Sequence, residues 1–242
     1  MKYTVIENRP LNATVLSMWL SGDTSAFRRP GQFVQVYVPG FYLRRPISVC
    51  EWTEGRLRLV YKPVGPGTEK LAAFKPGDDL DLLPGLGNGF DASLLGCHPL
   101  LVGGGVGLPP LLGLCRQLLA ERRLPSVLAG FAGEDDVFLL DDFEALGVPV
   151  TVTTQDGSRG LQGLVTNALP RLDFDSLAAC GPIPMMKALR NTAGQVPQLY
   201  SLEERMGCGF GACMGCTVQT AGGPARVCKE GPVFRGEELM WS

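Results

Sequence analysis

The sequence holds little of what several common functions require. Its 242 residues include a single histidine, His98, which precedes a proline. The sequence therefore contains no recognisable Ser/His/Asp constellation for hydrolytic chemistry. Positive charge is scarce as well, since 22 lysines and arginines are set against 24 aspartates and glutamates, for a formal net charge of −2. Because there is no basic run with interleaved aromatic residues, the sequence gives no support for nucleic-acid binding.

Long apolar runs are also missing. The most apolar stretch, Pro99–Cys115, is interrupted by glycine and proline, and it is shorter than the about 20 apolar residues of a membrane-spanning helix. Residues 1–8 lack the apolar core of a secretory signal peptide. Apolar residues make up 45% of the chain and charged residues 19%, which is an ordinary balance for a globular protein with a hydrophobic core. We therefore expect a soluble, cytoplasmic protein.

Cysteine, by contrast, is abundant and unevenly placed. Disulfide frameworks are typical of small secreted domains, whereas clustered thiols in a cytosolic protein more often hold a metal. Of the eight cysteines, four stand alone and four gather in one short segment. Cys50, Cys97, Cys115 and Cys180 are the isolated ones, and Cys208, Cys213, Cys216 and Cys228 form the cluster.

The order of local patterns predicts three parts. Residues 1–97 contain short runs rich in β-branched and aromatic residues, separated by Gly, Pro and Asp, which predicts a small antiparallel β-barrel. In residues 98–202 strand-like and helix-like segments alternate, which predicts a doubly wound α/β domain with a parallel sheet. Residues 203–242 are rich in Gly and Cys and predict a separate small lobe built around a ligand.

The expected elements can be placed along the chain. Barrel strands are expected at Val5–Asn8, Thr14–Leu20, Phe33–Val38, Ile47–Trp52, Leu57–Tyr61 and Leu80–Leu83. In the second part, strands are expected at Leu100–Val102, Val127–Phe131, Val148–Thr153, Leu177–Cys180 and Gln198–Leu202. Helices are expected between them, at Leu108–Leu119, Val137–Leu146, Leu161–Leu169 and Met185–Thr192.

The strongest motif is the cysteine cluster. Cys208, Cys213 and Cys216, with Cys228 further along, have the C-x4-C-x2-C…C spacing of a plant-type 2Fe–2S site. The glycines between and beside them would let the loop wrap closely round a cluster and direct backbone N–H groups at its sulfurs. Structural zinc also suits four thiolates, although zinc sites favour paired C-x2-C units and only one is present. Unligated thiols are the remaining alternative.

A second motif is a glycine run at a strand-to-helix turn. Gly103, Gly104, Gly105 and Gly107 follow the expected strand Leu100–Val102 and open the next helix. Such a turn lets the pyrophosphate of a dinucleotide approach the helix N-terminus. The spacing is not G-x-G-x-x-G, and a tight turn that packs the helix on the sheet is the alternative interpretation.

Two segments of the barrel region could bind phosphate. Arg44-Arg45-Pro46-Ile47-Ser48 sets paired arginines beside a rigid proline, and arginine can hold a pyrophosphate bidentately. Gly65-Pro66-Gly67-Thr68 is a glycine turn that carries a hydroxyl group. A solvated strand end and a plain turn are the respective alternatives.

Two further signals lie at the ends of expected sheet strands, where open α/β sheets bind their ligands. Cys180-Gly181-Pro182 ends one strand, although an isolated cysteine is often a small buried hydrophobe, which is also our expectation for the other isolated cysteines. Another strand runs into Glu134-Asp135-Asp136, whose carboxylates would repel a 2′-phosphate. We therefore expect a preference for NADH over NADPH, with a solvated acidic loop as the alternative.

In this order the motifs resemble the ferredoxin–NADP reductase superfamily, which pairs a flavin-binding antiparallel barrel with a nicotinamide-binding α/β domain. Arg45-Pro46-Ile47-Ser48 is similar to its R-x-Y-S flavin motif, with Ile47 where many members carry tyrosine. Gly103–Pro109 is similar to its glycine-rich dinucleotide loop, and Cys180-Gly181-Pro182 to its C-G-P motif. Residues 41–48 and 201–209 closely resemble one branch, the electron-transfer subunits of two-component NAD-dependent dihydroorotate dehydrogenases. The resemblance covers essentially the whole chain.

The resemblance implies an oxidoreductase subunit without a catalytic acid or base of its own. Its partner would be an FMN-containing dihydroorotate dehydrogenase catalytic subunit, and electrons would pass between that FMN and NAD through a 2Fe–2S cluster and FAD, in pyrimidine biosynthesis. The resemblance places FAD on Arg45, Pro46, Ile47, Ser48, Val60, Tyr61, Lys62, Gly67 and Thr68; NAD on Gly103, Gly104, Gly105, Gly107, Cys180, Gly181 and Pro182; and the cluster on Cys208, Cys213, Cys216 and Cys228.

Other functions share parts of this pattern. A subunit that serves ferredoxin, sulfide or hydrogen metabolism would have the same architecture, and a redox sensor or zinc-stabilised binding module would need no enzymatic activity. The residues between the cluster cysteines are small or apolar, and none is charged. We therefore expect Phe210 and Met214 to form an exposed patch for a redox partner; shielding of the cluster from water is the alternative.

Overall fold

The first part of the chain is a closed antiparallel barrel, as expected. The computed structural model describes residues 1–241. The short helix α1 (Pro66–Ala72) contributes Leu71 to the barrel core, where the sequence indicated only a turn. Around the barrel the six strands follow the order β1 (Lys2–Pro10), β2 (Leu16–Ser21), β5 (Arg56–Tyr61), β4 (Arg45–Thr53), β3 (Phe33–Val36) and β6 (Asp79–Leu86).

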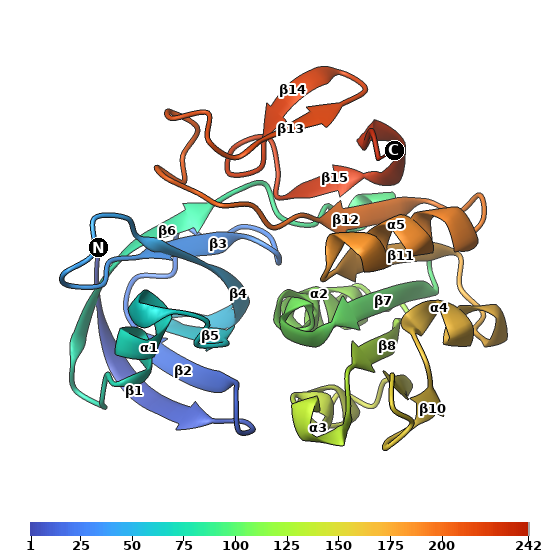
Figure 1. Ribbon diagram of the computed structural model, residues 1–242, viewed down its shortest axis with the longest axis horizontal. Coiled ribbons are helices and arrows are strands. Elements are labelled where there is room, and N and C mark those ends of the chain that lie inside the picture. The colour runs from blue at the N-terminus through green and yellow to red at the C-terminus, as the bar shows by residue number, and fades with distance from the viewer. Residues whose placement is uncertain (242) are drawn as a thin grey trace.

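The second part is a sheet with helices on both faces, shown beside the barrel in Figure 1. The seven strands follow the order β10 (Leu161–Gln162), β9 (Val150–Thr154), β8 (Ser126–Phe131), β7 (Pro99–Gly104), β11 (Ser176–Cys180), β12 (Gln198–Ser201) and β15 (Val233–Arg235). All pairings are parallel except that of β15 with β12. Helices α2 (Pro109–Ala120) and α3 (Leu140–Glu144) pack on the face that holds Leu101, and α4 (Val165–Ala168) and α5 (Ile183–Thr192) pack on the opposite face.

Two expected helices are wrong in extent. The expected helix Leu161–Leu169 begins instead as strand β10, which pairs with β9, and only Val165–Ala168 is α-helical. Gly160 and Gly163 have positive φ on either side of β10, which is incompatible with a continuous helix. The expected helix Val137–Leu146 is confined to α3, because Leu139 has a left-handed φ of 66° and a helix cannot run through it.

The C-terminal residues form a lobe that lies over both other parts (Figure 1). It contains a two-stranded ribbon, β13 (Thr217–Thr220) and β14 (Gly223–Arg226). The lobe then contributes β15 to the large sheet, and Phe234 shares an apolar cluster with Phe33 of the barrel and Leu100 of the sheet. The lobe therefore shares its core with its neighbours.

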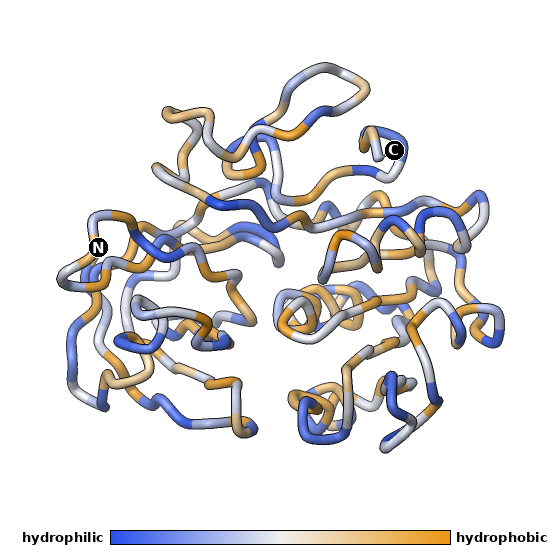
Figure 2. The backbone as a smooth tube through the Cα atoms, viewed as in Figure 1, coloured by the Kyte–Doolittle hydropathy of each residue, from blue (hydrophilic) through white to orange (hydrophobic). Residues whose placement is uncertain are grey.

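An apolar junction joins the barrel to the large sheet. Val15, Cys50 and Val60 of the barrel belong to the same buried cluster as the leucines of α2. Gly113 of α2 lies so close to β4 that a Cβ there would stand 3.0 Å from the carbonyl oxygen of Cys50. Leucines of α2 and β7 are buried in this junction, and the segments that carry them are partly orange, that is hydrophobic, in Figure 2. Among residues 1–241, no helix is long and apolar enough to cross a bilayer.

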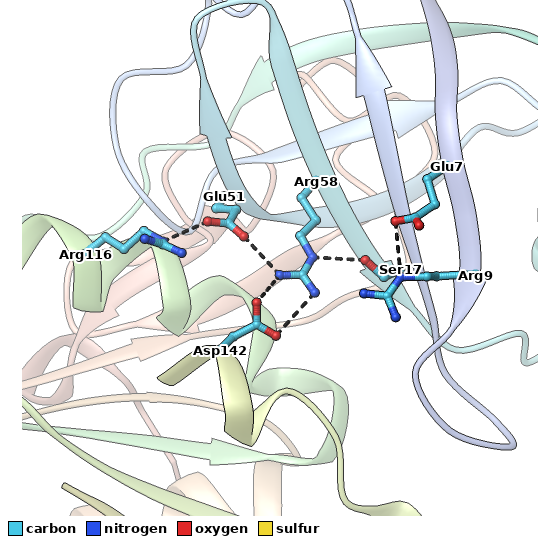
Figure 3. Close-up of polar contacts among 7 residues, drawn as sticks. All are labelled: Glu7, Arg9, Ser17, Glu51, Arg58, Arg116 and Asp142. Atoms are coloured by element: carbon cyan, nitrogen blue, oxygen red, sulfur yellow. Dashed lines mark hydrogen bonds and ion pairs between the residues drawn. The ribbon is translucent and has the colours of Figure 1, made fainter. Parts of the chain in front are cut away.

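A polar network crosses the same junction (Figure 3). The side chain of Arg58 on β5 is only 5% exposed. Its Nη1 lies 3.0 Å from Glu51 Oε1 and 2.5 Å from Asp142 Oδ1, which belongs to α3. Glu51 also accepts from Arg116 Nε of α2 at 2.8 Å, and Arg58 Nε donates to Ser17 Oγ at 3.0 Å. The network thus ties the barrel to two helices of the second part.

Replacing Arg58 by methionine should therefore destabilise the protein. Glu51 keeps Arg116 and Asp142 is partly exposed, so we expect a loss near the lower end of the range for a broken buried ion pair, about 3 kcal/mol of unfolding free energy. The exposed pair Arg9–Glu7 provides the control, and Arg9→Met should cost no more than about 1 kcal/mol. Denaturant titrations of both variants test this, and equal losses would contradict it.

Candidate functional site

A cleft of about 570 Å³ lies between the barrel and the carboxyl ends of strands in the large sheet. It brings together two motifs that are far apart in the sequence, the glycine run at Gly104, Gly105 and Gly107 and the pair Gly181 and Pro182. Barrel residues Thr14, Val15 and Lys62 close the other side. This is the location at which open α/β sheets bind ligands.

The glycines of the run serve different purposes. Gly105 has a φ of +51° and nothing within 4 Å of a Cβ position, so it is a turn residue that leaves space in the cleft. A Cβ on Gly107 would stand 2.2 Å from the carbonyl oxygen of Cys180, so only glycine lets the turn pack against the end of β11. Through this contact the glycine run fixes the position of Gly181 and Pro182 beside the cleft.

The cleft has the features of a dinucleotide site. Thr153 lines it with a hydroxyl that is 1% exposed and has no hydrogen-bond partner within residues 1–241. A buried hydroxyl without a partner is costly, and a polar ligand would satisfy it. Of the acidic residues expected near the ribose, Asp136 lines the cleft, whereas Glu134 and Asp135 are exposed and do not.

Of the residues at the C-G-P motif, Gly181 and Pro182 line the cleft together with Glu203, whereas Cys180 does not. Cys180 is buried, and burial, followed by the charge of Glu203, raises the pKa of its thiol well above the ordinary value. Glu203 lines the cleft, and desolvation by the cleft walls raises the pKa of its carboxyl group. Sequence analysis did not identify Glu203 as a site residue, because only the tertiary fold brings it to the cleft.

The predicted phosphate-binding residues of the barrel differ in whether their polar groups already have partners within the protein. Arg44 is committed to the barrel, because its Nη2 lies 2.5 Å from Asp81 Oδ2. The guanidinium of Arg45 stacks over Phe41 at 4.7 Å and lies against Gly67, where a Cβ would stand 2.2 Å from Arg45 Nε. Arg45 and Gly67 are therefore brought together, as a shared pyrophosphate site requires. The Thr68 hydroxyl caps its own turn by donating to the Gly65 carbonyl oxygen at 3.0 Å.

The strand alternation of the barrel separates the other predicted flavin residues. Ile47 and Tyr61 pack in the barrel core, and Tyr61 donates to Asn8 Oδ1 at 3.1 Å. Burial raises the pKa of Tyr61 to about 12. These two residues could contact a flavin only through their main chains. The positions on the outer face are Pro46, Ser48, Val60 and Lys62.

The clustered cysteines lie in two pairs. Cys208 Sγ accepts from the backbone N–H of Cys213 at 3.4 Å, and Cys213 Sγ accepts from that of Cys208 at 3.5 Å. Cys216 Sγ accepts from the backbone N–H of Cys228 at 3.4 Å. Within residues 1–241, no three or more Cys, His, Asp or Glu side chains converge as they would around a single metal ion. Two pairs suit a 2Fe–2S cluster, in which each iron takes two protein ligands.

The backbone of the loop also suits a cluster. Gly209 and Gly211 have φ of +80° and +92°, which few other residues adopt. Although burial opposes it, N–H groups of the loop lower the pKa of the Cys208 thiol to about 6. Burial and the neighbouring Cys216 sulfur raise the pKa of Cys228 to about 12. Thiolates this close repel one another, and a cationic centre would relieve the repulsion. The assignment of the four ligands stays a prediction.

The expected apolar patch is exposed. Phe210 is 57% and Met214 51% exposed, on either side of the exposed Cys213. The inner cysteines Cys216 and Cys228 are buried. The alternative, in which Phe210 and Met214 only cover the cluster, does not explain why half of each side chain faces solvent.

Comparison with known proteins gives consistent matches. The family model "Iron-sulfur cluster binding domain of dihydroorotate dehydrogenase B" matches residues 203–240. The dihydroorotate dehydrogenase B (NAD(+)) electron transfer subunit of Bacillus caldolyticus is 42% identical over 99% of this chain and 98% of its own length. The subunit of the same name from Bacillus pumilus is 39% identical over 99% of this chain and 97% of its own length.

A solved structure is similar over nearly the whole chain. It is a chain from the work described as the NADH-dependent reduced ferredoxin-NADP oxidoreductase structure, in a study of flavin-based electron bifurcation. It has 32% sequence identity and a TM-score of 0.89, and the match covers 98% of this chain and 89% of that one. The likeness therefore includes the arrangement of all three parts and extends beyond the barrel and the sheet.

The paired thiols generate the first prediction for this site. Replacing Cys208 or Cys216 by serine should strip or destabilise the cluster while FAD stays bound, because the barrel residues are untouched. Iron and acid-labile sulfide assays, with the flavin absorbance, measure both. Cys97→Ser is the matched control, since Cys97 is exposed and lies outside the cysteine segment. Normal iron and sulfide in both cluster variants would refute the assignment.

The acidic residue in the cleft generates the second. We expect a higher kcat/KM with NADH than with NADPH, because Asp136 would repel a 2′-phosphate. Asp136→Ser should narrow that preference by about tenfold, or about 1.4 kcal/mol. Asp135→Ser, at an exposed position outside the cleft lining, should leave it unchanged. Similar efficiencies with both dinucleotides in the unaltered protein, at equal ionic strength, would show that the carboxylates do not discriminate.

Proposed function

Since this chain belongs to the family of dihydroorotate dehydrogenase B (NAD(+)) electron transfer subunits, we propose that it passes electrons between NAD and the FMN of a dihydroorotate dehydrogenase catalytic subunit. The route would run through FAD and a 2Fe–2S cluster. The overall reaction would be oxidation of dihydroorotate to orotate, in pyrimidine biosynthesis. The alignments cover almost the full length of both chains.

The contact between the cluster loop and the barrel carries this proposal. Gly209 packs directly on Gln35 of β3, and Gln35 pairs across the ladder with Pro46 of the expected flavin motif on β4. A flavin over the outer face of β4 would therefore lie one strand away from the cluster loop. The cleft that meets the glycine run opens on the same side of the barrel, at Lys62.

The residues of the chain hold and orient the groups that carry electrons. Flavin supplies the chemistry that exchanges a hydride with nicotinamide and single electrons with an iron–sulfur centre. The cleft would orient the dinucleotide through the glycine run, Arg45 and Gly67 would bind the pyrophosphate of FAD, and Ser48 on the outer face of β4 would contact the flavin. The cysteine loop holds the cluster at the surface. The chain has the task of placement and supplies no acid or base to the dihydroorotate reaction.

A second candidate function has one observation in its favour. The solved structure at 32% identity comes from an NADH-dependent reduced ferredoxin-NADP oxidoreductase, and subunits that serve ferredoxin, sulfide or hydrogen chemistry share this architecture. Against it stand the higher identity to the dihydroorotate dehydrogenase B subunits and a complete set of four cysteines in the cluster segment. For location we propose the cytoplasm, in whose reducing conditions the four cysteines outside the cluster segment would remain thiols.

Reconstitution with a catalytic subunit tests the proposal. The chain alone should oxidise NADH with artificial acceptors and should not oxidise dihydroorotate. Mixed with the FMN-containing catalytic subunit of a dihydroorotate dehydrogenase B, it should form a stable complex that couples dihydroorotate oxidation to NAD reduction. A tight complex with a hydrogenase or sulfur-reducing enzyme, together with none with the dihydroorotate subunit, would favour the second candidate.

The same mixture tests the exposed patch as the docking surface. Phe210→Glu should raise the Kd of the complex by at least about tenfold, or about 1.4 kcal/mol, because a charge replaces an apolar contact. Leu124→Glu is the matched control, since Leu124 is 64% exposed. It lies between α2 and the start of β8, at the end of the strands that is opposite the cleft. The iron content should not change in either variant. Equal affinities of the two variants would place the docking surface elsewhere.

A further inference from the structure

Gln35 is a buried polar side chain without a partner. It is 0% exposed, and both its amide nitrogen and its amide oxygen lack a hydrogen bond within residues 1–241. Burying a carboxamide in this state is costly, and an apolar residue of the same size would avoid the cost. A bound group that forms a hydrogen bond with the amide would remove this cost. The surroundings of the amide therefore indicate which group it is.

The strand alternation of β3 sets the direction of this side chain. Val34 and Val36 point into the barrel core. Phe33 and Gln35 therefore point outward, and Phe33 packs in the same cluster as Cys216 and Cys228. The outer face of β3 is thus covered by the cysteine lobe, and Gln35 lies beneath it.

The loop above Gln35 is shaped to admit the amide. Its Nε2 lies 2.6 Å from the point where a Cβ on Gly209 would stand, so only glycine fits there. Gly209 has a φ of +80° and directly follows Cys208. Cys208 Sγ already accepts from the backbone N–H of Ala212 at 3.2 Å. The Gln35 amide therefore approaches the cysteine loop from the barrel side. No side chain within residues 1–241 forms a hydrogen bond with it there.

The other neighbour of Gln35 is the expected flavin strand. Gln35 stands opposite Pro46 in the β3–β4 ladder, and its main-chain oxygen accepts from Arg44 Nη1 at 3.3 Å. The main chain of Gln35 is thus held by the barrel, and the side chain occupies the space between the flavin motif and the cysteine loop.

We propose that the Gln35 carboxamide donates an N–H hydrogen bond to a sulfur of the 2Fe–2S centre, either the Cys208 thiolate or an inorganic sulfide, and thereby raises the reduction potential of that centre. The proposal rests on the proposed function, which places a cluster on this loop. Hydrogen bonds to the sulfurs stabilise the more negative, reduced form and are among the factors that set such potentials. Gln35 is accordingly a residue that tunes and positions the centre, and it takes no part in bond making.

Potentiometric titration of the intact chain tests the proposal. Gln35→Met keeps the length of the side chain and removes the donor, and Gln35→Leu removes the donor with a shorter side chain that is also uncharged. The cluster is followed by its electron paramagnetic resonance signal and FAD by its absorbance. In both variants we expect the equilibrium constant for one-electron reduction of the cluster to fall by up to tenfold. This corresponds to a shift of up to about 59 mV to lower potential. The FAD potential should not change.

Gln219→Met is the matched control. Gln219 is an exposed glutamine on β13 of the same lobe, so the same chemical change there should leave both potentials unaltered. An unchanged cluster potential in both Gln35 variants would overturn the proposal, and so would a shift confined to FAD, which would show that the amide faces the flavin. A wild-type chain with FAD but no cluster signal would refute the proposed function, an outcome distinct from a cluster that is present and insensitive to residue 35.

Discussion

A flavin that exchanges electrons with both a nicotinamide and an iron–sulfur centre must lie within reach of both. The proposed function assigns that position to the outer face of β3, β4 and β5. Lys62, at the end of β5, borders the dinucleotide cleft. Gln35 on β3 meets the cysteine loop at Gly209. Between them, β4 carries Arg45 to Ser48. One side of the barrel therefore contacts both the large sheet, which carries the cleft, and the cysteine lobe. Contacts elsewhere in the structure hold these two parts against the barrel.

The two neighbours are held by different means. The large sheet is fixed by the close approach of α2 to β4 at Gly113 and by the buried guanidinium of Arg58. The cysteine lobe is fixed by shared apolar packing around Phe33 and by β15, which belongs to the large sheet. Buried contacts therefore set the relative positions of the three parts. A rigid arrangement of this kind suits electron transfer, because the distance between redox centres does not then depend on a mobile linker.

Sequence patterns predicted the architecture better than the directions of individual side chains. Strand runs, alternating strands and helices and the cysteine spacing are local signals, and they located the barrel, the sheet and the paired thiols. The burial of Ile47 and Tyr61 depends on the register of the barrel, and a slip of one residue would reverse it. Contacts between distant segments bring Glu203 to the cleft and place Gln35 under the cysteine loop. No local pattern encodes such contacts.

The pairing of β15 with β12 has a consequence for how the protein is made. Until Val233–Arg235 has left the ribosome, β12 is the edge of the large sheet. An open edge presents unpaired backbone groups to other chains and is a site of aggregation. Every cluster cysteine is synthesised before β15, so the short strand β15 replaces β12 at the edge of the sheet only at the end of synthesis. A chain that ends before residue 233 would therefore carry all four clustered cysteines but would still expose β12 at the edge of its large sheet.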